Sequence, residues 1–282
     1  MTHASYHDIP EKFSENFQEI SEKYSHFLLD MWGVVHDGFH ALPGAINTLN
    51  QLRVNKKKIL FISNSSRPAA SLEKLMDGMG IHRHEHYDHI HSSGDAVIEG
   101  LSDTSNKFSK KHYYYLGDTE HSHPLLPHIK GEQVLSLDEA SYVLLTALTP
   151  TIDMVLEEAL EKNLTLICAN PDIVAPHGKV ISYCPGLAAQ KYEKKGGHVI
   201  YYGKPFPPIY ESSLKKIGSP PLKNILTVGD SLHTDIKGAN AMGLDSLLIH
   251  SGIHHADSLD MLKNKFKKES AFPTYILSRF NW

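Results

Sequence analysis

Short apolar runs that end in polar residues recur along this chain of 282 residues, and they predict buried strands. Toward the two ends of the chain these runs are SHFLLD at 25–30, KKKILFISNSS at 56–66, NILTVGD at 224–230 and DSLLIHSG at 245–252. Segments with apolar residues at steps of three and four lie between them and predict amphipathic helices. Strands that alternate with helices in this way predict βαβ units and a mostly parallel sheet.

The helical segments follow from the spacing of their apolar residues. This spacing predicts helices at 13–24, 46–52, 71–81 and 231–243, and a strand that enters a helix at 88–101. Gly80 is expected to close the third of these helices, because glycine is the usual residue after a helix end.

The middle of the chain repeats the alternation by itself, in the order strand, strand, helix, strand. The four segments are KHYYYLGD, ASYVLLTAL, TIDMVLEEALEKN and LTLICANPD. This is enough material for a separate α/β module. We therefore predict an inserted domain at 96–199 within a discontinuous core domain at 1–95 and 200–282.

Composition narrows the class of protein. A hydrophobic content of 41% can build a sizeable core. The formal charge of −4 lacks the excess of basic residues that nucleic-acid binding favours, so we expect no nucleic-acid partner. The N-terminus has no apolar signal region and no run reaches the length of a membrane span, so we expect a soluble, cytoplasmic protein without a membrane partner. Cys168 and Cys184 are expected to be reduced and packed.

Histidine is frequent, with 20 residues in the chain. Five of them fall within IHRHEHYDHIHSSG, where imidazoles could bind a metal. Their alternation fits no common zinc spacing, so the favoured interpretation is a solvated loop that leads into a strand.

Polar groups that suit phosphoryl transfer follow several of the predicted strands. In a parallel sheet the carboxyl ends of the strands form the ligand-binding edge. A carboxylate nucleophile, hydroxyl and amide donors, a lysine and two further carboxylates would serve transfer through Mg²⁺. These groups are Asp30, Ser63, Asn64, Lys204, Asp230 and Asp235.

The order of FLLDMWGVV, FISNSS, YYGKP and VGDSLHTDIKGA resembles the four motifs of the haloacid dehalogenase (HAD) superfamily. The segments LPGAINTLNQL, ANPD and GKPFPPIY are similar to those of subfamily IIA, which contains nitrophenyl, nucleotide and sugar phosphatases. The resemblance covers residues from about 25 to 255. It implies a Rossmann-like core with a parallel sheet and an inserted α/β cap of the C2 type.

The resemblance also implies a role for each matching residue. Asp30 would attack phosphorus and become an aspartyl phosphate, which water then hydrolyses. Asp30, Asp230 and the backbone carbonyl of Trp32 would ligate Mg²⁺. Lys204 would balance charge on nucleophile and phosphate, and Asp235 would hold Lys204 or a metal-bound water.

Four further residues are expected to bind the substrate together with Ser63. By analogy with the family, Asn170 and Asp172 would contact the leaving group, with Tyr183 as an additional candidate, and backbone groups near Asn64 would bond the phosphoryl oxygens. Arg67, just after SNSS, would bind a second anionic group. Arg67 has a simpler alternative as a helix cap, and the Pro and Gly near Asn170 would also suit an ordinary turn. Members of the subfamily often dimerise through their caps, so the resemblance admits a homodimer.

Charge supports the requirement for a metal. A phosphate dianion with three carboxylates carries about −5, against about +3 from Mg²⁺ and a lysine. Without the ion such an arrangement would be very unfavourable in a cleft of low dielectric. Hard oxygen ligands suit Mg²⁺ better than zinc.

Trp32 departs from the family pattern, because most phosphatases of this superfamily have a second aspartate two residues after the nucleophile. That residue protonates the leaving oxygen and later activates water, whereas an indole only donates a hydrogen bond. General acid–base catalysis is typically worth about 10² to 10⁴-fold, so its loss predicts a slow enzyme. His36 or Asp37 would substitute for the acid, or both are exposed loop residues.

Two functions therefore remain open at the level of sequence. The first is a Mg²⁺-dependent phosphatase of small phosphorylated metabolites such as sugar phosphates or nucleotides. The alternative is a catalytically impaired protein that binds a phosphorylated ligand or regulates another process.

Overall fold

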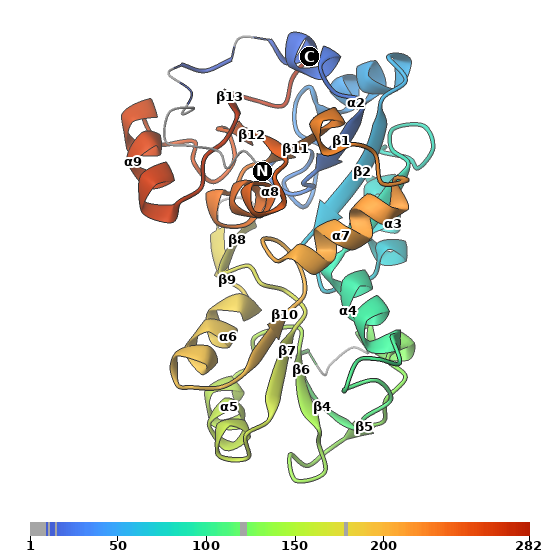
Figure 1. Ribbon diagram of the computed structural model, residues 1–282, viewed down its shortest axis with the longest axis vertical. Helices are drawn as coiled ribbons and strands as arrows, with labels where there is room; N and C mark the ends of the chain where they lie inside the picture. Colours follow the sequence, from blue (N-terminus) through green and yellow to red (C-terminus); the bar gives the residue numbers. More distant parts are fainter. Residues whose placement is uncertain (1–9, 11, 15, 119–122, 178–179) are drawn as a thin grey trace. The chain divides into compact units, whose positions relative to one another are not determined.

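The computed structural model describes residues 10, 12–14, 16–118, 123–177 and 180–282 (Figure 1). The chain forms two compact units, which we call the core unit and the inserted unit. The core unit comprises the described residues up to Ser63, Glu73–His91 and Lys204–Trp282. The inserted unit comprises Asn64–Leu72 and Ser92–Gly203.

The core unit is built on a six-stranded sheet in the order β13-β12-β11-β1-β2-β3. Its strands are β1 (His26–Leu29), β2 (Lys58–Ser63), β3 (His89–Ser92), β11 (Ile225–Gly229), β12 (Asp245–Ile249) and β13 (Tyr275–Leu277). The pairs β1–β2, β1–β11, β11–β12 and β12–β13 are all parallel. The expected parallel sheet is therefore confirmed, and β1 occupies an interior position in it.

Apart from α1, which precedes β1, the helices of the described chain lie in connections between strands. They are α1 (Phe17–Glu22), α2 (Ala45–Val54), α3 (Ala69–Gly78), α4 (Ser93–Ser102), α5 (Ile152–Glu161), α6 (Pro185–Lys194), α7 (Pro207–Lys216), α8 (Lys237–Met242) and α9 (Leu259–Glu269). A π-helical turn at Leu232–Ile236 precedes α8, where the sequence predicted one continuous helix. Gly80 adopts a φ of 77° beyond the end of α3, as expected of a residue that closes a helix.

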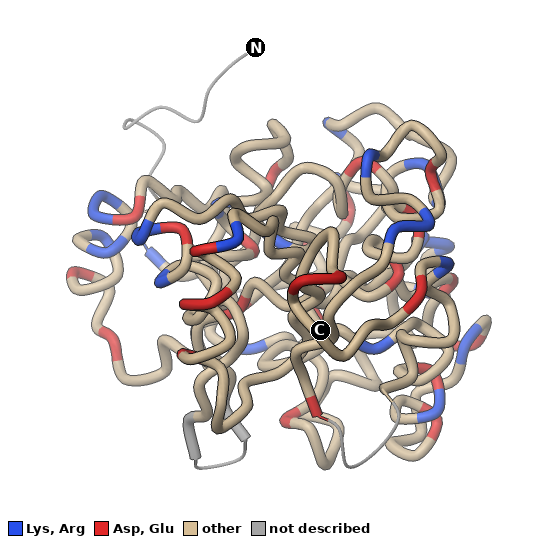
Figure 2. The backbone as a smooth tube through the Cα atoms, turned by 90° about the horizontal axis from the view of Figure 1, so that it is seen from below, with Lys and Arg blue, Asp and Glu red and all other residues tan. Residues whose placement is uncertain are grey.

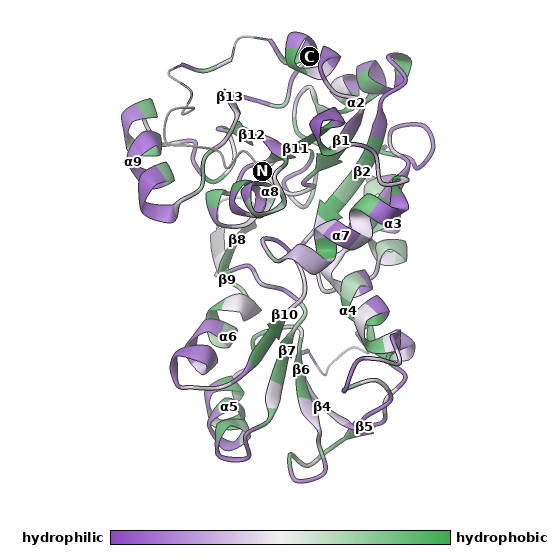
Figure 3. Cartoon of the chain, viewed as in Figure 1, coloured by the Kyte–Doolittle hydropathy of each residue, from purple (hydrophilic) through white to green (hydrophobic). Residues whose placement is uncertain are grey.

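Hydrophobic burial explains the central strands. Phe27, Leu28 and Leu29 of β1 are completely buried, because this strand has neighbours on both sides. Figure 3 shows the hydrophobic colour along β2, whereas α9 is mostly hydrophilic. Phe266 of α9 is nevertheless fully buried and packs in a cluster with residues of β12 and the π-helical turn.

The first helix is shorter than its apolar spacing predicted. Asn16 caps α1, because its side chain accepts a hydrogen bond from the backbone N–H of Gln18. Phe13 lies outside the helix, and the centroid of its ring is 5.1 Å from the centroid of the His250 ring. The backbone N–H of Ser14 donates to the carbonyl of Ile276, so this segment follows the edge of the sheet instead.

The inserted unit has its own five-stranded parallel sheet in the order β10-β7-β6-β4-β5. Its strands are β4 (Tyr113–Leu116), β5 (Gln133–Val134), β6 (Tyr142–Leu145), β7 (Thr165–Cys168) and β10 (Val199–Tyr201). The helices α5 and α6 contribute buried residues to a cluster with β6 and β7. The sequence did not predict the antiparallel hairpin of β8 (Val174–His177) and β9 (Val180–Tyr183).

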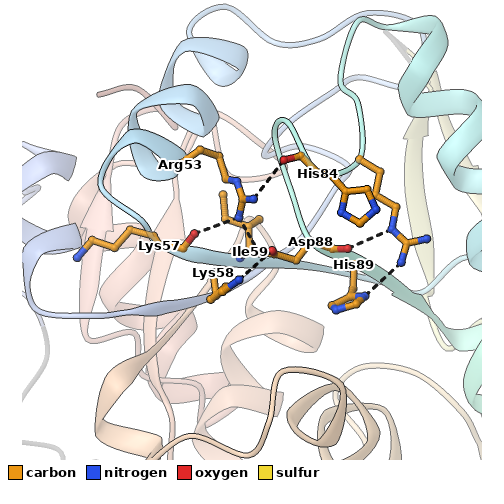
Figure 4. A network of polar contacts seen from close by, with 8 residues as sticks. Arg53, Lys57, Lys58, Ile59, His84, Asp88 and His89 are labelled. Atoms are coloured by element: carbon orange, nitrogen blue, oxygen red, sulfur yellow. Dashed lines mark hydrogen bonds and ion pairs between the residues drawn. The ribbon is translucent and has the colours of Figure 1, made fainter.

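A charged network fixes the amino-terminal edge of the core sheet (Figure 4). The carboxylate of Asp88 accepts hydrogen bonds from the Ile59 backbone N–H at 2.9 Å and from Arg53 at 2.8 Å. Arg53 also donates to the carbonyls of Lys57 and His84. Asp88 thus joins the start of β2 to the turn that precedes β3.

We predict that Asp88→Asn lowers the free energy of unfolding by about 1–3 kcal/mol at neutral pH, because Arg53 loses its charged partner. Burial tends to raise the pKa of Asp88, but the Ile59 N–H and Arg53 outweigh burial and lower it. The stabilisation by Asp88 should therefore be present above the unfolded pKa and disappear as pH falls through the lower folded pKa.

Denaturant unfolding of the wild type and of Asp88→Asn across pH tests this prediction. Asp138→Asn is the control, since Asp138 pairs with Lys162 on an exposed surface and its loss should change stability little. Equal stabilities of the two variants at neutral pH would contradict the assigned role of Asp88.

Candidate active site

Three polar residues meet at the carboxyl ends of neighbouring strands. Leu29 of β1 pairs with Val228 of β11 and with Phe61 of β2. Asp30 therefore follows β1 at the same edge where Asp230 follows β11 and Ser63 ends β2. The parallel register thus gathers groups that are separated by up to 200 residues in the chain.

Lys204 joins two of the predicted carboxylates. Its Nζ donates to Oδ1 of Asp30 at 2.6 Å and to Oδ1 of Asp235 at 2.7 Å. All three residues are buried, and Asp235 has no exposed surface. The ammonium group is therefore held between the candidate nucleophile and a second acid in a site of low dielectric.

Asp230 is enclosed by backbone on two sides. Its Oδ2 accepts a hydrogen bond from the Ile253 backbone N–H at 3.0 Å. A Cβ at Gly33 or at Gly252 would lie 2.1 Å from the same oxygen. Only glycine at these two positions lets the chain approach the carboxylate so closely, and Gly33 also has a φ of 77°.

Asp235 is fixed through both of its carboxylate oxygens. Oδ1 accepts from Lys204, and Oδ2 accepts from the Ser231 backbone N–H at 3.1 Å. Gly229 provides the space, since a Cβ there would lie 2.1 Å from the Asp235 Cγ. The π-helical turn carries Asp235, and such turns are frequent at functional sites.

The carboxylates need a further positive charge. Burial and the nearby charges of Asp30 and Asp235 raise the pKa of Asp230 well above its usual range. Burial opposes the charged form of Lys204, but the carboxylates of Asp235 and Asp30 outweigh it and raise the pKa of the lysine. Lys204 alone leaves this group of four residues with a negative charge.

A divalent cation fits the same residues. Ligand oxygens of Asp30, Asp230 and Asp235 lie within 4.8 Å of one another, and among the described residues these form the only such group of metal-binding side chains. All three donors are hard oxygens, which favour Mg²⁺. A dication would also balance the net negative charge of three carboxylates and one ammonium group.

The segment after Asp30 has no acid placed for proton transfer near neutral pH. His36 is buried, so the expectation that it is exposed is wrong. Its Nδ1 accepts from the Gly38 N–H at 3.0 Å, and burial lowers its pKa to about 4. Asp37 accepts from the backbone N–H groups of Phe39 and His40, and these bonds lower its pKa.

Trp32 is packed into this segment. Its ring centroid lies 5.6 Å from that of His36, and a Cβ at Gly38 would lie 2.6 Å from its indole. Gly38 has a φ of 99°, which favours glycine in addition to the close contact. Trp32, His36 and Gly38 therefore form one packed turn beside the candidate nucleophile.

Four of the predicted substrate-binding residues belong to the inserted unit. Asn64 is buried and its Nδ2 donates to Oδ1 of Asp172 at 2.8 Å. The Asp172 backbone N–H donates to Oδ1 of Asn170 at 3.0 Å, so these three residues form a chain of hydrogen bonds. Arg67 is exposed, and its backbone N–H donates to the Ser65 hydroxyl.

Two other sequence interpretations need correction. His86 and His91 are buried, with Nε2 of His91 bonded to the Ser212 hydroxyl at 2.6 Å, so the histidine-rich segment is only partly solvated. The segment near Asn170, whose Pro and Gly would suit an ordinary turn, continues into strand β8. Tyr183, at the end of β9, has 69% of its surface exposed.

The structure also adds residues that the motifs did not indicate. The backbone N–H groups of Ser231 and Ile253 donate to the carboxylates of Asp235 and Asp230. Every residue except proline has such a donor, so the residue type does not reveal it. The glycines that enclose Asp230 and Asp235 gave a weak signal, because each follows or precedes a predicted strand end.

Other surface features lie apart from these residues. A cavity of about 610 Å³ includes none of the predicted site residues, and it is lined by residues 13, 14, 16–18, 277–279, 281 and 282. Acidic and basic residues are interspersed along the chain in Figure 2. In the part of the chain that the structure describes, no helix is long and apolar enough to cross a membrane.

Two family models match separate parts of the chain. A model described as haloacid dehalogenase-like hydrolase matches residues 27–125, and a HAD-hydrolase-like model matches residues 201–280. The first match contains Asp30 and Ser63, and the second contains Lys204 with Asp230 and Asp235. The chain therefore belongs to the haloacid dehalogenase superfamily, as its motifs predicted.

Named relatives place it among the phosphatases of subfamily IIA. It is 26% identical to a dihydroxyacetone phosphatase of Corynebacterium glutamicum, over 89% of this chain and 88% of that protein. It is 24% identical to a 4-nitrophenylphosphatase of Schizosaccharomyces pombe, over 87% of this chain and 90% of that protein. The class is thus that of the HAD-like phosphoric monoester hydrolases.

Solved structures agree with this assignment. The chain matches a haloacid dehalogenase-like hydrolase of Brucella suis with a TM-score of 0.80 and 29% identity, covering 95% of this chain and 99% of that one. A glycerol phosphate phosphatase of Mycobacterium tuberculosis in complex with magnesium shares the fold, with a TM-score of 0.72, 22% identity and coverage of 93% and 76%. The predicted fold class, a Rossmann-like HAD core with an inserted cap, is confirmed.

We predict that Gly229→Ala weakens Mg²⁺ binding by about tenfold or more, because the added Cβ must displace the Asp235 carboxylate. Calorimetric titration with Mg²⁺ measures the change. Gly78→Ala in α3 is the matched control, since a Cβ there meets nothing within 4 Å. Equal affinities for the two variants would show that Asp235 does not contribute to the metal site.

Proposed function

We propose that this protein is a Mg²⁺-dependent phosphatase that acts on a small phosphorylated metabolite through an aspartyl-phosphate intermediate. The buried bridge from Lys204 to Asp30 and Asp235, beside Asp230, is the observation that carries the proposal. The phosphatase names of several relatives and the magnesium complex of one structural neighbour support it.

In the proposed reaction, a carboxylate oxygen of Asp30 attacks phosphorus while the bond from phosphorus to the leaving oxygen breaks. Water then attacks the phosphorus of the aspartyl phosphate, which releases inorganic phosphate and restores Asp30. Lys204 stabilises the negative charge on both the nucleophile and the phosphoryl group. Ser63 would donate to the phosphoryl oxygens from the end of β2.

Mg²⁺ would be held by Asp30, Asp230 and the backbone carbonyl of Trp32, and it would neutralise charge on the transferred group. Asp235 would keep Lys204 in place or bind a metal-bound water. All three carboxylates are buried, so their charges would be costly in free energy without a compensating cation.

The substrate is proposed to be a sugar phosphate or a nucleotide. Relatives named acid sugar phosphatase and ribonucleotide monophosphatase support this chemical class. The hydrogen-bonded residues Asn64, Asp172 and Asn170 would read the leaving group, and the exposed Arg67 would bind a second anion. We further propose that residues 96–199 act as the cap, and that a homodimer would form through it.

The alternative function is that of a protein which binds a phosphorylated ligand without useful turnover. Trp32 favours it, since neither His36 nor Asp37 is placed to replace the missing acid near neutral pH. The same observation has a milder consequence for an enzyme. Turnover would persist for leaving groups that depart without a proton.

We expect slow hydrolysis of nitrophenyl phosphate by the wild type in the presence of Mg²⁺, and loss of turnover in Asp30→Asn. Trp32→Asp should raise the rate, because it introduces an acid at the family's usual position. The rate of nitrophenolate release measures the activity of all three proteins. If none of the three is active, the binding function replaces the phosphatase.

The leaving group should control the rate of the wild type. We predict that nitrophenyl and acyl phosphates react faster than alkyl phosphates by about 10²-fold, the lower range of a general acid contribution. Trp32→Asp should reduce this preference, which separates a proton-transfer effect from altered binding. Equal kcat values for aryl and alkyl phosphates in the wild type would contradict the assigned consequence of Trp32.

A further inference from the structure

Tyr210 is a buried residue of α7 whose side chain contacts the backbone of the π-helical turn. Its side chain is fully buried. The hydroxyl donates to the backbone carbonyls of Thr234 and Asp235, each at 3.4 Å. These are long hydrogen bonds, but both acceptors belong to the turn that carries the Asp235 carboxylate.

Space for this hydroxyl is provided by Gly238. A Cβ at this glycine would lie 2.2 Å from the Tyr210 oxygen and 2.6 Å from two ring carbons. Gly238 stands at the second position of α8, directly after the π-helical turn. The absence of a side chain at Gly238 therefore leaves room for the ring and hydroxyl of Tyr210.

One short segment supplies two of the contacts to Asp235, in addition to the Ser231 backbone N–H. Lys204 binds its carboxylate at 2.7 Å, and Tyr210, six residues later, binds its backbone carbonyl. Because α7 begins at Pro207, the two side chains come from a loop and the helix that follows it. Asp235 is held at its side chain and at its backbone by one stretch of chain.

We propose that Tyr210 is a positioning residue for the Lys204–Asp235 pair. Without its hydroxyl, the turn would lose a buried donor and Asp235 would no longer be held in line with Lys204 and the metal-binding carboxylates. The hydrogen bonds of the Tyr210 hydroxyl go to the turn, so its proposed effect on catalysis is exerted through Asp235. The catalytic part of this inference rests on the proposed phosphatase function.

The test compares Tyr210→Phe with Tyr87→Phe. Tyr87 is also fully buried in the core unit, and its hydroxyl has no hydrogen-bond partner within the described residues, so its removal controls for loss of a buried hydroxyl. Each protein is assayed for kcat and KM with nitrophenyl phosphate, for Mg²⁺ affinity by calorimetry without substrate, and for melting temperature.

For Tyr210→Phe we expect kcat to fall about tenfold, with KM within about twofold of the wild type and Mg²⁺ bound about threefold more weakly. Tyr87→Phe should leave all three values unchanged. Gly238→Ala is a second variant, because its Cβ pushes the tyrosine from the turn and should reproduce the same changes.

Separate outcomes identify separate failures. If Tyr210→Phe matches Tyr87→Phe in kcat and in Mg²⁺ affinity, the positioning role is overturned while the phosphatase stands. If the wild type releases no nitrophenolate but Tyr210→Phe still weakens Mg²⁺ binding, the proposed function fails and the positioning of Asp235 by Tyr210 is supported. A fall in melting temperature without either change also overturns the positioning role.

Discussion

The buried ammonium group of Lys204 between Asp30 and Asp235 is the interaction on which the site depends. A lysine buried without partners would lose its charge, and a carboxylate buried without partners would gain a proton. Here the carboxylates of Asp235 and Asp30, at 2.7 and 2.6 Å, outweigh burial and raise the pKa of Lys204, so that its ammonium group keeps its charge. The fold must therefore deliver three segments to one point, and the parallel sheet with its π-helical turn does so.

Close packing of backbone around the acids is the second constraint. Gly33 and Gly252 crowd Asp230, and Gly229 crowds Asp235, so the carboxylates have little freedom to move apart. Burial, together with the like charges of Asp30 and Asp235, raises the pKa of Asp230. The site is consequently arranged to receive a cation, and its rigidity reduces the reorganisation needed when charge develops on a phosphoryl group.

Trp32 belongs to a packed turn directly after the candidate nucleophile. Its indole packs with His36 against Gly38, so the turn after the nucleophile is a well-packed structure. The lysine and carboxylates that would act on the phosphoryl group are all present, whereas the usual proton donor for the leaving group is replaced. Under the proposed function, phosphoryl transfer from good leaving groups would remain accessible, whereas protonation of poor leaving groups would limit the rate.

The sequence by itself determined the fold class and the four separated motifs. Apolar runs that end in polar residues are local signals, and they located β1, β2 and β11 together with Asp30, Ser63 and Asp230. The periodicity of 13–24 failed because the Asn16 cap and the contact of Ser14 with Ile276 are not encoded in hydrophobic spacing. It also could not distinguish the π-helical turn from an α-helix.

Only the tertiary structure decided which groups touch. Lys204 lies 174 positions from Asp30 in the chain, and backbone donors such as the N–H of Ile253 carry no residue-specific signal. Burial set the protonation of His36, whose ring would titrate near neutral pH if it were exposed. Residue types thus determined the available chemistry, whereas distances and desolvation, which depend on the packed chain, decided how those residues are held and charged.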